Sequence, residues 1–196
     1  MAIGIGAGGA VWTPGAFPLA QPDPTVQNTQ LDHSQHRPAH SAFPLCYLAH
    51  DLDLPANVGS LFRLADALGV ERIYLTGRSP APPNSRLRKT SRAAEKHVPF
   101  SQAPDPLPIL HALKASGYRI ISLELSSASI DIRELAVRAT DRICLVLGSE
   151  NAGVSQSLLD LSEQTVHIPM RGQHSSMNVA TACAIATFEL TRAFRA

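Results

Sequence analysis

Short apolar runs alternate with segments of helical spacing along the chain from residue 43 onward. The apolar runs predict strands at 43–49, 72–76, 97–100, 118–123, 142–147 and 165–168. Apolar positions at helical spacing predict helices at 57–68, 106–116, 131–137, 155–161 and 178–194. The run at 142–147 is strongly apolar, which is typical of a strand in the middle of a parallel sheet. The alternation predicts an α/β domain whose mostly parallel sheet is flanked by helices.

Residues 1–42 lack this pattern. They hold five of the 12 glycines and five of the 15 prolines, and they show no sustained period of a helix or a strand. We therefore expect a disordered or loosely attached leader in front of a folded domain at 43–196. The leader's His33, His36 and His40 are interpreted as linker histidines, because no cysteine or carboxylate cluster completes a metal site.

Composition and charge limit the class of protein. The formal net charge is only +1, so a nucleic acid would have to be bound by a local basic patch. Cys46, Cys144 and Cys183 lie in apolar runs without a Cys-x-x-Cys pair, which indicates buried thiols in a reducing compartment. No apolar stretch reaches the ~20 residues that span a bilayer, and the N-terminus lacks the basic start of a secretory signal. We expect a cytoplasmic protein.

Two glycine-rich segments are similar to nucleotide-binding loops. Gly4–Gly9 fits G-x-G-x-x-G, but no strand can precede it and no apolar helix follows, so the dinucleotide fingerprint fails. Segment 148–155 is close to a phosphate loop, yet Val154 replaces the essential lysine and Glu150 would repel phosphates. This second segment does follow a buried strand, and open α/β sheets bind ligands at the carboxyl ends of their strands.

Three segments carry residues suited to a site. In the first, Gly59 permits close approach of another backbone, Asn57 is a natural N-cap, and Arg63 lies off the apolar stripe and can project into a cleft. The second is the turn at 147–153, and the third is the loop and small-residue helix start at 168–180. Each segment alone also fits an ordinary role: a capped surface helix, a tight turn, and a helix packed closely on a sheet.

Together the segments resemble the three ordered motifs of the SpoU/TrmH branch of the SPOUT methyltransferases. They read Asn-x-Gly-x-x-x-Arg at 57–63, Gly-x-Glu-x-x-Gly at 148–153, and Ile-Pro-Met with Ser-Met-Asn-Val-Ala at 168–180. Segment 89–99 is similar to the stretch between the family's first two motifs. The resemblance covers about 44–192 and leaves out the leader. Met177 stands where the family usually has leucine, a swap that conserves volume.

The resemblance implies an S-adenosylmethionine-dependent RNA methyltransferase that modifies a ribose 2′-hydroxyl of tRNA or rRNA, without a metal. It also implies a C-terminal trefoil knot and a homodimer with the knot region at the interface. By position, the cofactor pocket would be lined by Gly148, Ile168 and Met177. The catalytic site would comprise Asn57, Arg63, Glu150, Ser176 and Asn178. The family assigns Arg63 as the base; a guanidinium is effectively always protonated, so a phosphate clamp is the alternative role.

Basic residues dominate the chain between residues 78 and 96, where Glu95 is the only acid. The candidate RNA-binding residues there are Arg86, Arg88, Lys89, Arg92 and Lys96. Such a charge run is often only a solvated face, but beside the three motifs RNA contact is the better interpretation. Two alternatives remain: a non-catalytic RNA-binding knot protein, and a dinucleotide-dependent oxidoreductase, which lacks a credible fingerprint.

Overall fold

The structure is a computed structural model that describes residues 29–30, 32, 42–173 and 175–195. The chain divides into two units, residues 1–38 and 39–196. The predicted leader at 1–42 lies outside the described residues except for 29–30, 32 and 42, and so do its three histidines.

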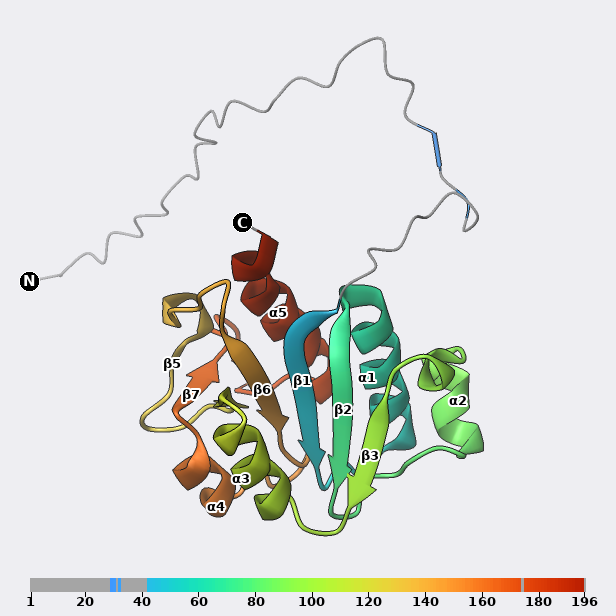
Figure 1. Cartoon of the computed structure of the whole chain (residues 1–196), viewed down its shortest axis with the longest axis horizontal. Helices are drawn as coiled ribbons and strands as arrows, with labels where there is room; N and C mark the ends of the chain where they lie inside the picture. The colour runs from blue at the N-terminus through green and yellow to red at the C-terminus, as the bar shows by residue number, and fades with distance from the viewer. Residues whose placement is uncertain (1–28, 31, 33–41, 174, 196) are drawn as a thin grey trace, which may run out of the picture. The chain divides into compact units, whose positions relative to one another are not determined.

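A seven-stranded sheet forms the centre of this unit (Figure 1). In chain order its strands are β1 (Phe43–His50), β2 (Val70–Thr76), β3 (Phe100–Ala103), β4 (Tyr118–Leu123), β5 (Ile130–Asp131), β6 (Arg142–Leu147) and β7 (Gln164–His167). The order across the sheet is β3-β2-β1-β6-β4-β7-β5, and every pairing between these strands is parallel. The predicted α/β class with a mostly parallel sheet is confirmed.

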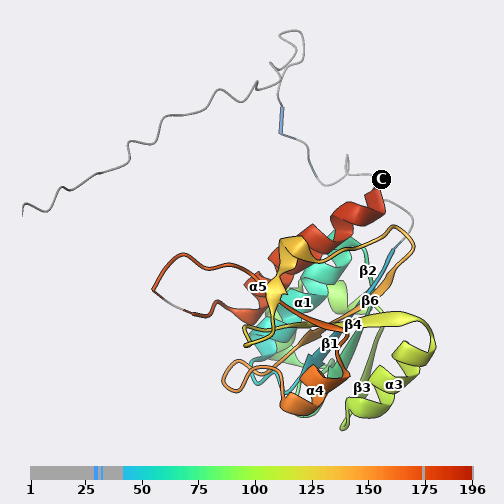
Figure 2. The ribbon, with the colours of Figure 1, turned by 90° about the vertical axis from the view of Figure 1, so that its left-hand side faces the viewer.

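Helices cover both faces of the sheet. The helices are α1 (Pro55–Leu68), α2 (Ser85–Ser91), α3 (Leu107–Ala115), α4 (Gln156–Leu161) and α5 (Val179–Thr191), with 3₁₀ turns η2 (Ala94–Lys96), η3 (Ile132–Glu134) and η4 (Arg192–Arg195). Figures 1 and 2 show α1 and α5 on one side of the sheet and α3 and α4 on the other. The core divides in the same way: Leu45 and Tyr47 of β1 pack in the α1–α5 layer, whereas Cys46 and Leu48 pack in the α3–α4 layer. Successive side chains of a strand point to opposite faces, which explains this division.

Buried polar groups in the described unit are paired. The hydroxyl of Tyr47 lies 2.6 Å from that of Thr187, so β1 and α5 are joined by a hydrogen bond inside the core. Cys46, Cys144 and Cys183 are free and buried, as predicted. In the part of the chain that the structure describes, no helix combines the length and the apolar character that crossing a membrane requires.

The structure contains one helix that was not predicted, and three local predictions are wrong. The polar stretch 85–91 forms helix α2, whose N-terminus is capped by the Asn84 side chain. The third strand begins at Phe100 and not at residue 97, and the segment predicted as a helix at 131–137 contains the end of β5 followed by η3. Asn57 is not an N-cap: α1 begins at Pro55, because proline is well suited to the first helical position.

Candidate active site

A cavity with a volume of about 790 Å³ lies where β6, β4 and β7 end. The turn after β6 forms one wall, the start of α5 and the loop before it form another, and the start of α1 closes the third side. Its lining includes Leu54, Asn57, Glu124, Leu125, Gly148, Glu150, Gly153, His167, Ile168, Ser176, Met177 and Asn178. All but one of the predicted catalytic and cofactor-binding residues therefore line one cavity.

The turn after β6 is closed on itself. Ser149 and Gly153 exchange two backbone hydrogen bonds, of 3.1 and 2.9 Å, and Gly153 has a φ of +67°, which favours glycine. A Cβ on Gly148 would lie 2.2 Å from the carbonyl carbon and oxygen of Gly153. The backbone that approaches Gly148 most closely is thus that of its own turn.

Glu150 joins this turn to the start of α1. Its Oε1 accepts a hydrogen bond of 2.7 Å from the side-chain amide of Asn57, and its Oε2 accepts one of 3.0 Å from the backbone N–H of Asp53. Asn57 is 7% exposed, and its Oδ1 in turn accepts a hydrogen bond of 2.9 Å from the side-chain amide of Asn178. One chain of hydrogen bonds therefore links the three segments that the sequence singled out.

Asn178 ends this chain by capping α5. Its Oδ1 accepts from the backbone N–H groups of Ala180 and Thr181, at 2.9 and 3.2 Å. An N-cap side chain satisfies helix donors that have no partner within the helix. The Oδ1 of Asn178 thus fixes the direction in which α5 leaves the cavity, while the NH2 of the same amide donates to Asn57.

The environment of Glu150 keeps its carboxylate charged. Burial raises the pKa of Glu150, but the hydrogen bonds from Asn57 and from backbone N–H groups outweigh burial, and the net pKa is below its ordinary value. A group whose pKa is lower in the folded than in the unfolded state adds stability at neutral pH. That stability is lost as the pH falls through the lowered pKa.

We expect Glu150→Gln to lower the free energy of unfolding at pH 7 by about 1–3 kcal/mol, because hydrogen bonds to a charged acceptor are lost. The deficit should shrink at acidic pH, because the parental carboxylate also becomes protonated as the pH falls through its lowered pKa. Urea unfolding at pH 7 and at acidic pH measures this difference in the free energy of unfolding. Glu134→Gln removes an exposed carboxylate and should change the free energy of unfolding by less than about 0.5 kcal/mol. A deficit of equal size at both pH values would contradict the role assigned to the charge.

Arg63 is the exception among the predicted site residues. Its side chain is exposed, and it does not line the cavity within a single chain. Arg63 follows Asn57 by six positions, which corresponds to a rotation of about 240° around the helix axis. The two side chains therefore leave α1 in different directions. Gly59, one turn before Arg63, faces Thr90 of α2. The expectation that Arg63 converges with Glu150 and the Ser176–Asn178 turn is therefore wrong for one chain taken alone.

Sequence reasoning missed Glu124, Leu125 and His167, which also line the cavity. Glu124 directly follows β4, and its Oε2 accepts a hydrogen bond of 2.9 Å from the backbone N–H of Val154. Its position after a buried strand was the available signal, since ligands bind at the carboxyl ends of parallel strands. In the described part of the chain, no cluster of three or more His, Cys, Asp or Glu side chains could hold a metal ion.

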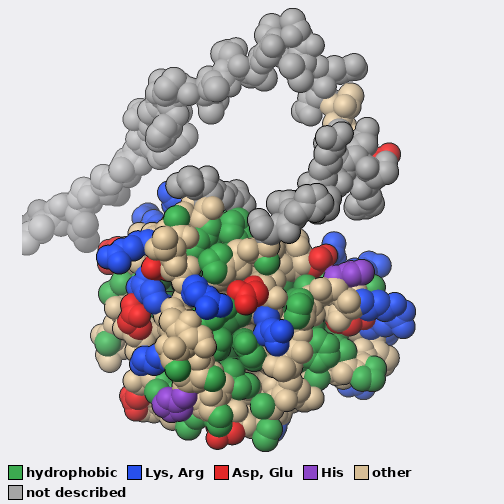
Figure 3. All heavy atoms as spheres, viewed as in Figure 1, with side chains coloured by type: hydrophobic (Ala, Val, Ile, Leu, Met, Phe, Trp, Pro, Cys, Tyr) green, Lys and Arg blue, Asp and Glu red, His purple; other side chains and the backbone are tan. Residues whose placement is uncertain are grey.

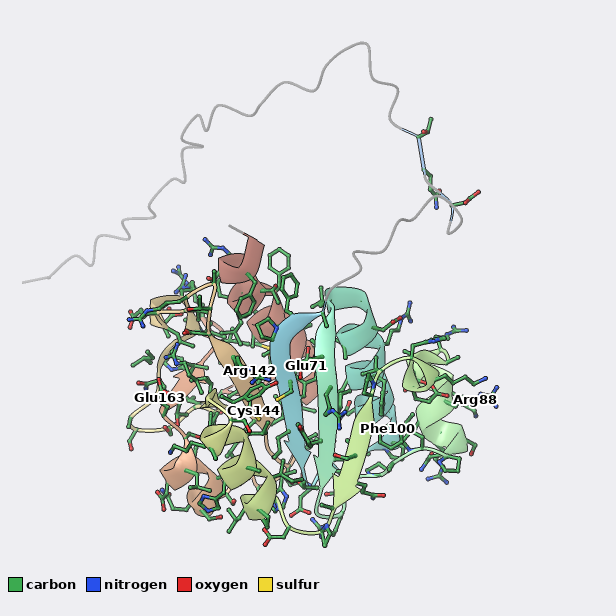
Figure 4. All side chains as sticks on the ribbon, in the orientation of Figure 1. Glu71, Arg88, Phe100, Arg142, Cys144 and Glu163 are labelled. Atoms are coloured by element: carbon green, nitrogen blue, oxygen red, sulfur yellow. The ribbon has the colours of Figure 1, made fainter. Side chains whose placement is uncertain are left out.

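The predicted RNA-binding residues gather at α2 and η2. Arg86, Arg88, Lys89, Arg92 and Lys96 are all exposed. Figure 3 shows Lys and Arg side chains clustered over α2, at the right of the view, and Figure 4 shows Arg88 pointing away from the sheet. A hollow of about 710 Å³ opens beside them, lined in part by Arg88, Lys89 and Lys96. We call these five residues the α2 basic patch.

Comparisons with known proteins agree with this geometry. Residues 45–188 match the SpoU rRNA Methylase family. The chain is 33% identical over 141 residues to the tRNA (guanosine(18)-2′-O)-methyltransferase of Escherichia coli K12, covering 70% of this chain and 58% of that protein. It is 34% identical over 137 residues to an uncharacterized tRNA/rRNA methyltransferase of Mycobacterium tuberculosis, covering 69% of this chain and 48% of that protein. The chain thus spans about half the length of these curated relatives.

Two solved structures are similar to the described fold. The TrmH/SpoU tRNA modifying enzyme of A. aeolicus superposes with a TM-score of 0.71 at 26% identity, covering 79% of this chain and 77% of that one. The SpoU methyltransferase AviRb from Streptomyces viridochromogenes, in complex with the cofactor AdoMet, gives a TM-score of 0.69 at 28% identity, covering 79% of this chain and 62% of that one.

Proposed function

Because the chain belongs to the SpoU rRNA methylase family, we propose that it transfers the methyl group of S-adenosylmethionine to a ribose 2′-hydroxyl of tRNA or rRNA. One observation carries the proposal. The hydrogen bonds that Asn57 donates to Glu150 and that Asn178 donates to Asn57 join the three family motifs around one cavity at the carboxyl ends of the sheet strands. The names of the relatives supply the reaction and the class of substrate.

The cavity suits a nucleoside ligand in size and lining. Its volume lies within the range of about 300–1,000 Å³ for small-molecule sites. Gly148, Ile168 and Met177 would hold the cofactor, since the half-buried Ile168 and Met177 offer apolar contact and the Gly148 turn offers backbone groups. When bound, S-adenosylmethionine supplies an electrophilic methyl group on a sulfonium.

The chain's own residues would position the ribose. Methyl transfer requires the 2′-oxygen about 3 Å from the methyl carbon and the loss of its proton. Asn57, Glu150 and Asn178 hold the cavity walls through their hydrogen bonds, and the exposed Ser176 offers a hydroxyl at the same wall. Arg63 is exposed and has no ion-pair partner in the described part of the chain, so its guanidinium is available to bind an RNA phosphate next to the reacting ribose.

We propose further that the chain forms a homodimer and that the segment from the Gly148 turn to α5 forms a trefoil knot, as the family resemblance implies. Figure 2 shows the loop before α5 projecting from the body of the domain. A groove of about 520 Å³ beside α5 includes Ile168, Pro169 and Ile185, and Ile185 is 43% exposed. This partly apolar surface, whose lining also includes Arg133, Arg171 and Glu189, is suited to a second copy of the chain. In such a dimer, Arg63 could act at the partner's cavity.

Titration of the whole chain with S-adenosylmethionine and NAD, followed by methyl incorporation into cellular RNA, tests the function. We expect S-adenosylmethionine to bind and ribose methylation to follow. Cofactor binding without methyl incorporation would favour the non-catalytic RNA-binding alternative, and binding of NAD alone would favour the oxidoreductase.

The α2 basic patch provides a further prediction. Replacing both Arg88 and Lys89 by alanine should weaken RNA binding about tenfold or more and reduce its salt dependence, because two phosphate contacts are lost. Cofactor affinity should not change, since neither residue lines the cavity. Arg138→Ala removes an exposed arginine outside the patch and serves as the control. RNA affinity that is insensitive to the double substitution would exclude the patch as an RNA contact.

A further inference from the structure

The described lining of the cavity carries acidic side chains without Lys or Arg side chains to balance them. Two carboxylates line it, Glu124 and Glu150, whereas no Lys or Arg is among the described residues of its lining. Glu150 accepts hydrogen bonds from the Asn57 side chain and from two backbone N–H groups, so its charge is already stabilised by groups of the chain itself. Glu124 is the carboxylate that remains to interact with a ligand.

The position of Glu124 is held by the turn that it faces. Its Oε2 accepts from the N–H of Val154 and its Oε1 accepts from the N–H of Leu125, both at 2.9 Å. A Cβ on Gly153 would lie 2.4 Å from Oε2, so the carboxylate packs directly against this glycine. A carboxylate offers about four acceptor positions, and these two donors use half of them. Glu124 makes no ion pair in the described part of the chain, so its negative charge is not neutralised there.

We propose that Glu124 makes the cavity selective for the cationic methyl donor over its neutral product. The inference rests on the proposed function and deepens it. In the transfer, the carbon–sulfur bond breaks with its electron pair remaining on sulfur, the 2′-oxygen forms the new bond to carbon, and the hydroxyl proton passes to solvent. The sulfonium becomes a neutral thioether, so the cavity's ligand loses one positive charge. Glu124 stabilises the first ligand more than the second, which favours entry of the donor and release of the product.

The Glu124→Gln variant removes the charge and keeps the shape. Glutamine retains one oxygen, which can accept from Val154, so the turn keeps its hydrogen bond; the bond from the backbone N–H of the neighbouring, exposed Leu125 is lost, and water can replace it. Calorimetric titration with S-adenosylmethionine and S-adenosylhomocysteine gives the ratio of the two affinities. We expect the ratio to shift about tenfold toward the neutral product, the size of a charge–charge contact in a partly screened site.

A matched control removes a glutamate elsewhere. Glu163 is exposed, does not line the cavity, and pairs with Arg119; Figure 4 places it at the outer edge of the domain. Glu163→Gln should leave the affinity ratio unchanged.

Three results would overturn the proposal. If Glu124→Gln weakens both compounds equally, the carboxylate binds a part that they share, such as a ribose hydroxyl. If both affinities and their ratio stay unchanged, Glu124 does not interact with the ligand. A parent chain that binds neither compound would overturn the proposed function and this inference with it, whereas the first two results leave the proposed function standing.

Discussion

Gly148→Ala is expected to weaken S-adenosylmethionine binding severely and, with it, methyl transfer. The added Cβ would lie 2.2 Å from the carbonyl carbon and oxygen of Gly153 and 2.3 Å from the nitrogen of Val154. All three are backbone atoms of a turn that is closed by the Ser149–Gly153 hydrogen bonds and held at Val154 by Glu124. The turn cannot rotate away as a flexible side chain could, so it must move and change the cavity wall.

We expect the affinity to fall by about a hundredfold. This lies at the upper end of the ~1–3 kcal/mol that forcing atoms into a packed site typically costs, because here the displaced atoms line the cavity. Calorimetry measures the affinity, and circular dichroism checks that the sheet is retained. Gly172→Ala is the matched control, because a Cβ at Gly172 meets nothing within 4 Å. Parental affinity in Gly148→Ala would show that this turn does not shape the cofactor site.

The strands were predictable because a buried strand consists mainly of apolar residues. In β6, Ile143–Leu147 are all buried, and a strand covered by helices on both faces needs an apolar residue at every position. Helix α2 could not be predicted in this way, because only Leu87 and Ser91 are buried and the other positions are polar or charged. Its formation depends on the Asn84 cap and on close packing against Gly59 of α1, which are contacts that no local pattern contains.

The candidate site likewise contains residues whose proximity the sequence predicts and residues whose contacts only the fold reveals. Asn57, Glu150 and Asn178 each lie beside the end of a strand or the start of a helix at one edge of the sheet, so their proximity follows from the α/β pattern together with the order of the motifs. The phase of Arg63 relative to Leu61 shows that it leaves the core, but phase alone does not say which neighbour it faces. Glu124 is a single acid between apolar and serine residues, and only the folded turn at 153–154 reveals its contact.

Arg63→Ala is expected to reduce methyl transfer by about a hundredfold or more, the loss seen when a group that stabilises developing charge is removed. Because Arg63 does not line the cavity of its own chain, the affinity for S-adenosylhomocysteine should stay close to that of the parent. Arg63→Lys should recover part of the activity if the residue clamps a phosphate, since an ammonium also binds phosphate. Methyl incorporation and calorimetry on the same preparations measure both quantities, and an active Arg63→Ala variant would remove Arg63 from the mechanism.

If the chain forms the proposed homodimer, mixed dimers can test whether Arg63 acts at the cavity of its own chain or at that of its partner. If Arg63 serves the partner's cavity, a dimer of one Arg63→Ala chain and one Gly148→Ala chain contains one complete site, formed by the intact cavity of the first chain and the intact arginine of the second. Its activity should reach about half that of the parent, although neither variant is active alone. If Arg63 serves its own cavity, both sites of the mixed dimer are defective and no activity returns. Co-expression of the two variants with different affinity tags isolates the mixed dimer, so restored methylation would place the arginine across the subunit interface and its absence would place it within one chain.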